Sequence, residues 1–350
     1  MSGSEKKSLI VAGDYCSIIN KKFFHGMSVP WEVKGYELDF EVSESVGGIF
    51  DLSFYGIVEV QGKDAQDYLQ RMTTVQFKSL GTQSVAHGAF LNGRGGVVVL
   101  GMFRRLGPDA FQIFVLNDLK QKLMDHIEQF HFAESFAVRD LSEDLTVMGC
   151  WSRDGQLASS LGISAELKSL ELQSLEILGP EGVVWRDVRR SSLYWMIVKR
   201  PLASTFIQNC IKNGHFILGL HLYEYFRIQS GMPDAGEELS EKDIILEGNF
   251  EEAVARNKGC YPGQEVVERI FTYGQVNRKL LRVEGIADSG ELFALPQTIK
   301  QGDKEVGTVV ACEKSPTNDN AAVGLMYVRK DFWNSKESWA VPPNWRISLA

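Results

Sequence analysis

The sequence KGCYPGQE occupies residues 258–265, and the prediction of the fold begins from it. Gly259 and Gly263 bracket Cys260, with one proline in between. Glycine adopts backbone conformations that are closed to other residues, and proline fixes φ. The run therefore predicts a tight, rigid loop that presents one side chain, and residues 264–270 after it predict a short helix or strand.

Cys260 has two interpretations on these residues alone. Lys258 and Arg256 lie close in sequence, and cationic neighbours favour a thiolate over a thiol. Acidic neighbours offset them, at Glu251, Glu252, Glu265 and Glu268. The thiol is therefore either reactive or a small buried residue in a packed turn, and the local charges by themselves do not favour the reactive interpretation.

The composition bounds the class of protein. With 350 residues, of which 44% are hydrophobic, the chain can bury a sizeable core and predicts two or three domains. A formal net charge of -8 disfavours wide nucleic-acid binding, because phosphate backbones attract basic proteins. Five scattered cysteines without a C-x-x-C pair predict neither a disulfide framework nor a zinc site, and the six histidines lack metal-ligand spacing. We therefore expect a reduced, cytoplasmic protein without a bound metal, a membrane-spanning segment or stable nucleic-acid binding.

Strands and helices alternate after an N-terminal extension predicted over residues 1–45. Apolar alternation predicts a strand over 57–60, and helical spacing predicts a helix over 65–72. The turn at residues 92–96, with sequence NGRGG, predicts a hairpin. The remaining predicted elements are the hairpin strands 86–91 and 97–105, a strand over 111–116 and a helix over 118–130. This order predicts a first α/β lobe over 46–139.

A second lobe of the same kind is predicted over residues 140–276. Its predicted strands are 145–149, 179–185 and 194–198, and its predicted helices are 156–161 and 218–230, the last ended by Gly231. After Asn277 the sequence pattern changes to short apolar runs that are separated by glycine and proline. The apolar runs lie at residues 280–283, 305–311 and 321–328. These runs predict a small C-terminal β-barrel over 277–350.

Together these motifs resemble the YgfZ-type folate-binding proteins, which are relatives of the glycine cleavage T-protein, an aminomethyltransferase. The eight-residue run at 258–265, called the octad below, carries the resemblance most specifically. It is continued by Val266-Val267-Glu268-Arg269. Weaker motifs follow in the family's order between residues 46 and 350: Gly48-Ile49-Phe50-Asp51-Leu52-Ser53, Gly62-Lys63-Asp64-Ala65, Thr73-Thr74, Gly95-Gly96, Arg227-Ile228-Gln229-Ser230-Gly231-Met232-Pro233 and Asn249. The resemblance implies an α+β fold of two interlocked α/β lobes of the T-protein folate-binding type, with a C-terminal β-barrel around a folate cleft.

The resemblance also implies which residues of the octad region act. It favours a functional Cys260 over a packing role, with Lys258 beside it as the second catalytic candidate. The other motif residues that it implies are Gly259, Tyr261, Gly263, Gln264, Glu265 and Arg269.

Candidate folate contacts come from the same resemblance. Two cleft aromatics, tryptophans in the family, fall on Tyr55 and Tyr223, and Arg227 could meet a carboxylate. The alternatives are half-buried core aromatics for the two tyrosines and an ion pair for the arginine. A weak similarity to a family Arg-Asp-x-Arg run involves Arg186, Asp187 and Arg189.

One departure bears on catalysis. T-proteins carry an acidic pair just after the Gly-Gly of the hairpin, and a carboxylate there orients the amine and manages its proton. In this chain Val99 and Leu100 stand in place of that pair. The departure argues against aminomethyltransferase activity.

Three functional hypotheses remain. The first, which the resemblance favours, is a tetrahydrofolate-binding accessory factor for iron–sulfur protein assembly or maintenance, with an effect on tRNA modification. Its cofactor would be tetrahydrofolate or a derivative, and its partners would be iron–sulfur proteins or assembly factors. The second is a folate-dependent aminomethyltransferase or demethylase that takes a carboxylate from Glu224 or Glu247. The third is an interaction module that has lost folate binding.

Overall fold

The computed structural model describes residues 6–13, 15–287, 291–342 and 344–350. Two compact units divide the chain. The first consists of Met1–Arg71, Val75–Gly88 and Val99–Tyr223, and the second of Met72–Thr74, Ala89–Val98 and Glu224–Ala350. The chain therefore passes between the units several times, and each unit is described separately.

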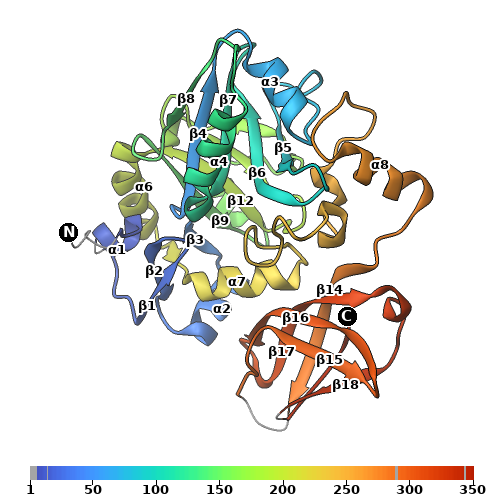
Figure 1. The fold of residues 1–350 in the computed structure, drawn as a ribbon. Helices are drawn as coiled ribbons and strands as arrows, with labels where there is room; N and C mark the ends of the chain where they lie inside the picture. Colours follow the sequence, from blue (N-terminus) through green and yellow to red (C-terminus); the bar gives the residue numbers. More distant parts are fainter. Residues whose placement is uncertain (1–5, 14, 288–290, 343) are drawn as a thin grey trace, which may run out of the picture. The chain divides into compact units, whose positions relative to one another are not determined.

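A six-stranded sheet forms one layer of the first unit (Figure 1). Its strand order is β10 (Leu172–Ser174), β11 (Val183–Arg186), β12 (Leu193–Lys199), β9 (Leu145–Trp151), β3 (Gly48–Asp51) and β13 (Phe216–Ile217). The β13–β3 pair is parallel, and the others are antiparallel. Helices α5 (Gln156–Ser160) and α6 (Arg200–Lys212) bury apolar side chains in one core with β9 and β12, including Met148, Met196 and Phe206.

The second layer of the first unit is a five-stranded sheet. Its order is β5 (Val85–Leu91), β6 (Val97–Arg105), β7 (Ala110–Leu116), β4 (Tyr55–Gln61) and β8 (Ala137–Asp140), with α3 (Ala65–Met72) and α4 (Asn117–Gln129) connecting strands. Of the apolar positions that predicted a helix at α3, Ala65, Tyr68 and Leu69 are buried, and Met72 is half-buried. The Tyr68 hydroxyl donates a hydrogen bond to the Ile127 carbonyl at 3.0 Å, which ties α3 to α4.

The N-terminal segment contributes to the same unit. It contains α1 (Leu9–Gly13), the hairpin β1 (Asn20–Phe24) with β2 (Met27–Glu32), and α2 (Tyr36–Ser45). Ile10 and Val33 lie in the core cluster of the six-stranded sheet. The backbone N–H of Ile10 donates to the Asp51 carboxylate at 2.7 Å.

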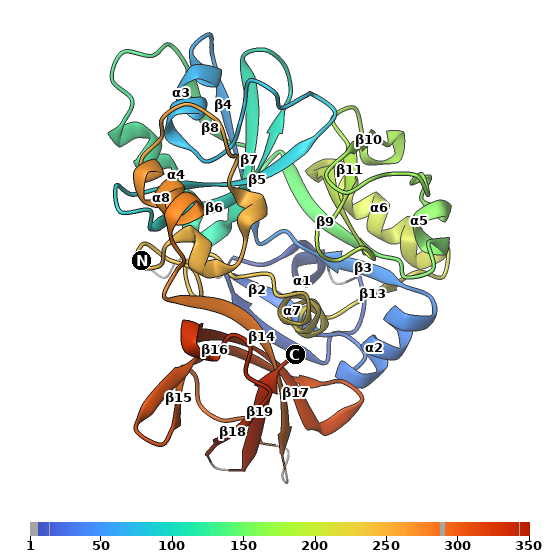
Figure 2. The same cartoon turned by 90° about the vertical axis from the view of Figure 1, so that its right-hand side faces the viewer.

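The second unit contains the end of α7 (Leu220–Gln229), the short 3-10 helices η2 (Ile245–Gly248) and η3 (Glu251–Ala253), α8 (Gln264–Tyr273) and a barrel (Figure 2). The barrel sheet is antiparallel, with the order β15 (Gln297–Gln301), β16 (Lys304–Ser315), β17 (Asn318–Arg329), β14 (Arg278–Ala287), β19 (Trp345–Leu349) and β18 (Ser338–Val341). β15 and β18 also lie side by side, so the sheet is nearly closed. Its interior is filled by Val283, Ile299, Val309, Met326 and Trp345.

The mixed α+β class and the barrel agree with the sequence prediction, while other elements differ in detail. Of the helix or strand predicted over residues 264–270, the structure forms the helix. The strand predicted over 179–185 begins only at Val183, because a turn in which the Gly182 N–H donates to the Gly179 carbonyl at 2.8 Å precedes it. Helix α6 was not predicted from the sequence, although Pro201 lies in its first turn. None of the helices in the described ranges is long and apolar enough to span a membrane.

Candidate functional site

Cys260 lies on the loop between η3 and α8 of the second unit, and its side chain is exposed. The structure describes all five cysteines, and Cys260 is the exposed one. Burial raises the pKa of the Cys210 and Cys312 thiols to about 12, and it also raises the pKa of Cys150. Burial therefore disfavours the thiolate at those three positions, whereas Cys260 is open to an external reagent.

A single glycine fixes the position of this loop. Gly263 has φ 78° and is the N-cap of α8. A Cβ atom there would lie 2.6 Å from the Asn92 carbonyl oxygen and 2.8 Å from the Gly95 Cα. Both the positive φ and the close approach exclude a side chain. Gly259 differs, since its φ is not in the positive range and a Cβ would meet nothing within 4 Å.

The turn against which Gly263 packs is itself held rigidly. Asn92 Oδ1 accepts hydrogen bonds from the backbone N–H groups of Arg94 at 2.9 Å and Gly96 at 3.0 Å. The Ile245 N–H donates to the Gly95 carbonyl at 3.1 Å. The tip of the β5–β6 hairpin, predicted from its turn residues, is therefore part of the scaffold that holds the cysteine loop.

Lys258 points inward from the same loop and is buried. Its Nζ donates to the backbone carbonyl of Thr73 and lies 5.0 Å from the centroid of the Tyr261 ring. Desolvation lowers the pKa of Lys258 to about 7. The desolvated amine can therefore be neutral near physiological pH.

The other octad residues, together with Arg269, divide between the loop and α8. Tyr261 is buried, desolvation raises its pKa to about 12, and its hydroxyl has no hydrogen-bond partner in the described part of the chain. The Gln264 N–H donates to the Tyr261 carbonyl at 3.1 Å, and its side-chain amide lies 3.5 Å from the Lys258 carbonyl. Glu265 and Arg269 are exposed on α8. Tyr261 and Gln264 thus order the loop, and the two charged residues face solvent.

In the first unit the two predicted folate tyrosines come together. Tyr55 begins β4, and Tyr223 lies on α7. Their hydroxyl oxygens are 3.4 Å apart, and Tyr55 packs edge-on against Trp195 with ring centroids 5.1 Å apart. Tyr223 is buried, whereas Tyr55 is half-buried.

Sequence reasoning missed a buried cation in this aromatic cluster. The Arg190 guanidinium carbon lies 4.9 Å from the Tyr223 ring centroid and 5.7 Å from that of Trp195. Its Nη2 donates to Asp187 Oδ2 at 3.0 Å, and the Trp195 indole donates to the same oxygen at 2.7 Å. The weak Arg-Asp-x-Arg similarity contained Asp187 and ended one residue before the arginine that joins the cluster.

Arg227, the third predicted folate contact, has its donors fully engaged. Nε donates to Glu224 at 3.0 Å, Nη1 to the Met232 carbonyl at 2.7 Å, and Nη2 to Glu238 at 2.7 Å. All these groups are buried in the second unit. This geometry corresponds to the ion-pair alternative, and a ligand carboxylate could reach Arg227 only by displacing a glutamate.

The two carboxylates considered for transfer chemistry, Glu224 and Glu247, are also paired with arginines. Glu224 belongs to the Arg227 network, and Glu247 Oε2 accepts from Arg278 Nη2 at 3.1 Å. Val99 and Leu100 are buried core residues of β6. No group of three or more histidine, cysteine, aspartate or glutamate side chains within the described residues is arranged to hold a metal ion.

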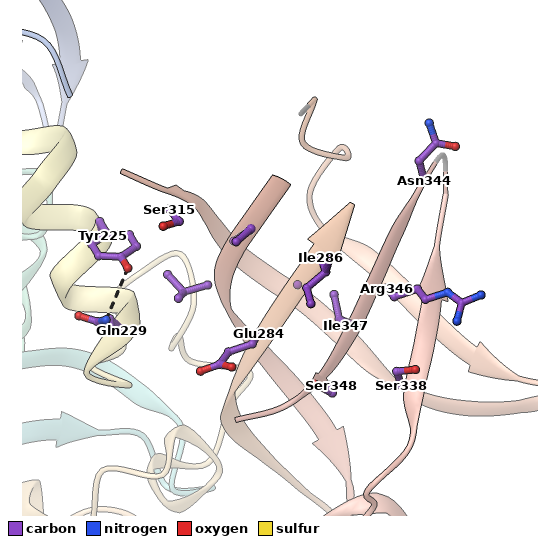
Figure 3. A pocket seen from close by; sticks show the side chains of 14 residues that line it. Tyr225, Gln229, Glu284, Ile286, Ser315, Ser338, Asn344, Arg346, Ile347 and Ser348 are labelled. Atoms are coloured by element: carbon purple, nitrogen blue, oxygen red, sulfur yellow. Dashed lines mark hydrogen bonds between the residues drawn. The ribbon is translucent and has the colours of Figure 1, made fainter. Parts of the chain in front are cut away.

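A surface cavity of about 550 Å³ lies against the outer face of the barrel within the second unit (Figure 3). Tyr225 and Gln229 of α7 line one side, and barrel residues including Glu284, Ile286 and Arg346 line the other. Its lining mixes one acid, one base, hydroxyls and aliphatic side chains. None of the predicted site residues lies among them.

Comparisons with known proteins agree with this architecture. The model of the GCVT N-terminal domain matches residues 25–186. An aminomethyltransferase of Rubrobacter xylanophilus is 25% identical over 314 residues, covering 87% of this chain and 82% of that protein. A putative chloroplastic transferase of Arabidopsis thaliana is 22% identical, covering 81% of this chain and 65% of that protein.

The similarity extends to a solved structure. The glycine cleavage aminomethyltransferase T of Bartonella henselae superposes with a TM-score of 0.83, covering 99% of this chain and 97% of that chain at 16% sequence identity. The chain therefore has the fold of glycine cleavage aminomethyltransferases, as the sequence predicted. At these identities the comparisons support a GcvT-like relative.

The contact of Gly263 with the hairpin turn predicts opposite behaviour for two neighbouring glycines. Gly263→Ala should lower the free energy of unfolding by at least about 2 kcal/mol, from a strained φ and a backbone clash. Gly259→Ala should change it by less than about 0.5 kcal/mol, because the added methyl group meets open space. Urea unfolding of both variants measures the difference, and equal effects would contradict the steric account.

The buried amine of Lys258 predicts a dependence of stability on pH. Its folded-state pKa of about 7 lies below the ordinary 10.5, so between these values the unfolded chain binds more protons than the folded chain. The contribution of Lys258 to the free energy of unfolding therefore rises with pH across that window. Lys258→Met should flatten this rise in urea unfolding measured at pH 7 and 9.5.

Lys242→Met is the matched control, because Lys242 is exposed and its amine is hydrated in both states. That variant should follow the wild-type pH dependence. Identical slopes for wild type and Lys258→Met would show that Lys258 is not titrating in the buried state.

Proposed function

We propose that this chain is a tetrahydrofolate-binding accessory factor that acts through Cys260 in the assembly or maintenance of iron–sulfur proteins. The observation that carries the proposal is the exposed thiol on a loop held by Gly263 against the hairpin turn. A rigid loop presents the sulfur to an external partner at little entropic cost. An effect on tRNA modification would follow through iron–sulfur enzymes that modify tRNA.

The same loop supplies a proton acceptor. The Lys258 amine, with its pKa lowered to about 7, lies on the same loop two residues before Cys260. A group that titrates near the working pH is suited to general acid–base catalysis. We assign Lys258 the role of accepting a proton during the reaction of the thiol, in addition to holding the loop through the Thr73 carbonyl.

Folate binding is assigned to the aromatic cluster of the first unit. Tyr55 and Tyr223 offer ring faces and hydroxyl groups, which suit a flat ring system with polar edges. Because of its engaged donors, Arg227 is proposed to orient α7 rather than to bind a folate carboxylate directly.

A folate-dependent aminomethyltransferase or demethylase is the second candidate, and the relatives named aminomethyltransferase favour it. Against it stand the apolar Val99 and Leu100 and the arginine partners of Glu224 and Glu247. Turnover of a methylamine-type substrate with tetrahydrofolate would favour this candidate over the accessory factor.

Titration with tetrahydrofolate tests the folate assignment and separates it from an interaction module without folate. Wild type should bind saturably in calorimetry. Tyr55→Ala should weaken binding roughly 2- to 10-fold through loss of a ring contact, and Tyr55→Phe should retain most of the affinity. Tyr273→Ala, at a tyrosine 89% exposed on α8, is the control. Absence of saturable binding to wild type would refute the folate assignment.

Replacement of the thiol tests the role of Cys260. Cys260→Ser should unfold at the wild-type urea midpoint but fail to restore iron–sulfur enzyme activity in a strain that lacks this protein. Because Cys260 is the exposed thiol, the variant should also lose the fastest site of iodoacetamide labelling. Cys16→Ser should behave as wild type in both assays, and full rescue by Cys260→Ser would sink the proposed role of the thiol.

A further inference from the structure

Arg190 is a buried arginine with unsatisfied hydrogen-bond donors, whereas charged groups in protein interiors are usually fully hydrogen-bonded. Arg190 is only 5% exposed, and its Nε and Nη1 atoms have no hydrogen-bond partner among the described residues. Leaving donors of a buried charged group unsatisfied costs free energy. Arg227, equally buried, has each nitrogen engaged, whereas two of the three guanidinium nitrogens of Arg190 are not.

The backbone holds Arg190 in this position. It lies in the turn between β11 and β12, where Asp187 Oδ1 accepts from the backbone N–H groups of Arg189 at 2.9 Å and Arg190 at 2.8 Å. The Leu193 N–H donates to the Arg190 carbonyl at 2.8 Å. Asp187 thus fixes both the main chain and one edge of the guanidinium.

The surroundings of Arg190 decide which ligand its free donors suit. The Tyr223 and Trp195 rings lie on the guanidinium at 4.9 and 5.7 Å, so flat groups line the site. The charge of Arg190 is already balanced by Asp187 at 3.0 Å. An anion would bring a second negative charge close to the Asp187 carboxylate in a buried setting, which is unfavourable. An uncharged acceptor adds hydrogen bonds without that repulsion.

We infer that Arg190 binds an uncharged acceptor on a planar heterocycle, such as a lactam carbonyl oxygen, within the Tyr55–Tyr223–Trp195 cluster. This inference deepens the proposed folate binding and rests on it, since a pterin carries such a ring carbonyl and the glutamate tail does not. Tyr55 is the half-buried member of the cluster. Its hydroxyl contact with Tyr223 is long, at 3.4 Å.

Binding of ligand fragments to Arg190 variants tests the inference. Arg190→Met removes all donors, and Arg190→Lys keeps the charge beside Asp187 but loses the guanidinium geometry. Both should weaken binding of tetrahydrofolate and of tetrahydropterin about 10- to 100-fold in anaerobic calorimetry. Binding of p-aminobenzoyl-glutamate, the tail without a pterin, should not change. Arg186→Met is the control, because Arg186 Nε already donates to the Ser191 carbonyl at 2.7 Å.

A measurement on the wild-type side chain avoids dependence on folding of the variants. In protein labelled with ¹⁵N-arginine, the Nε–H signal that is missing from Arg190→Lys should shift when tetrahydropterin is added. A saturable shift together with weakened variants supports the inference. Tight binding of tetrahydrofolate to wild type with unchanged variants, or with no shift, overturns the role of Arg190 alone. Failure of wild type to bind tetrahydrofolate overturns both the role of Arg190 and the folate assignment.

Discussion

The close approach of Gly263 to the turn at residues 92–95 is the constraint on which the cysteine loop depends. The backbones meet where a Cβ atom would lie 2.6 Å from the Asn92 carbonyl oxygen, so neither segment can move independently. The same turn accepts the Ile245 N–H, and a Cβ at Gly96 would lie 2.1 Å from the Glu241 carbonyl oxygen. Hairpin, η2 region and α8 therefore share one junction of main-chain contacts, and the exposed thiol is three residues from it.

Local sequence features predicted the parts of this junction but not their assembly. The NGRGG turn and the glycine before α8 could be predicted from the sequence, because their backbone conformations restrict the residue type. At Gly259 neither the backbone conformation nor the open surroundings restrict the residue type in this way. The inward direction of Lys258 could not be predicted, because its partner is the carbonyl of Thr73, 185 positions away in the chain. Which charges surround a thiol is a tertiary property, and counting neighbours in sequence did not reveal it.

The aromatic cluster shows the same limit. The family resemblance identified Tyr55 and Tyr223, and their hydroxyl groups meet. Arg190 was overlooked because nothing in a turn of consecutive charged residues indicates which side chain is buried. That choice depends on the register of β11 and β12, in which Trp185 lies opposite Trp195, so that the Trp195 indole reaches Asp187. Asp187 then selects Arg190 as its partner.

The buried arginines Arg190 and Arg227 illustrate how burial alone fails to distinguish structure from function. Around Arg227, two glutamates and a carbonyl satisfy the guanidinium, so the group gains nothing from a ligand and serves to join α7 to the following loop. Around Arg190, one carboxylate balances the charge, while the faces of two rings occupy space where acceptors would otherwise lie. The first arrangement has its lowest free energy as it stands, and the second gains hydrogen bonds when a neutral acceptor arrives. Unsatisfied hydrogen-bond donors, rather than buried charge, are therefore the property that marks a binding group in this fold.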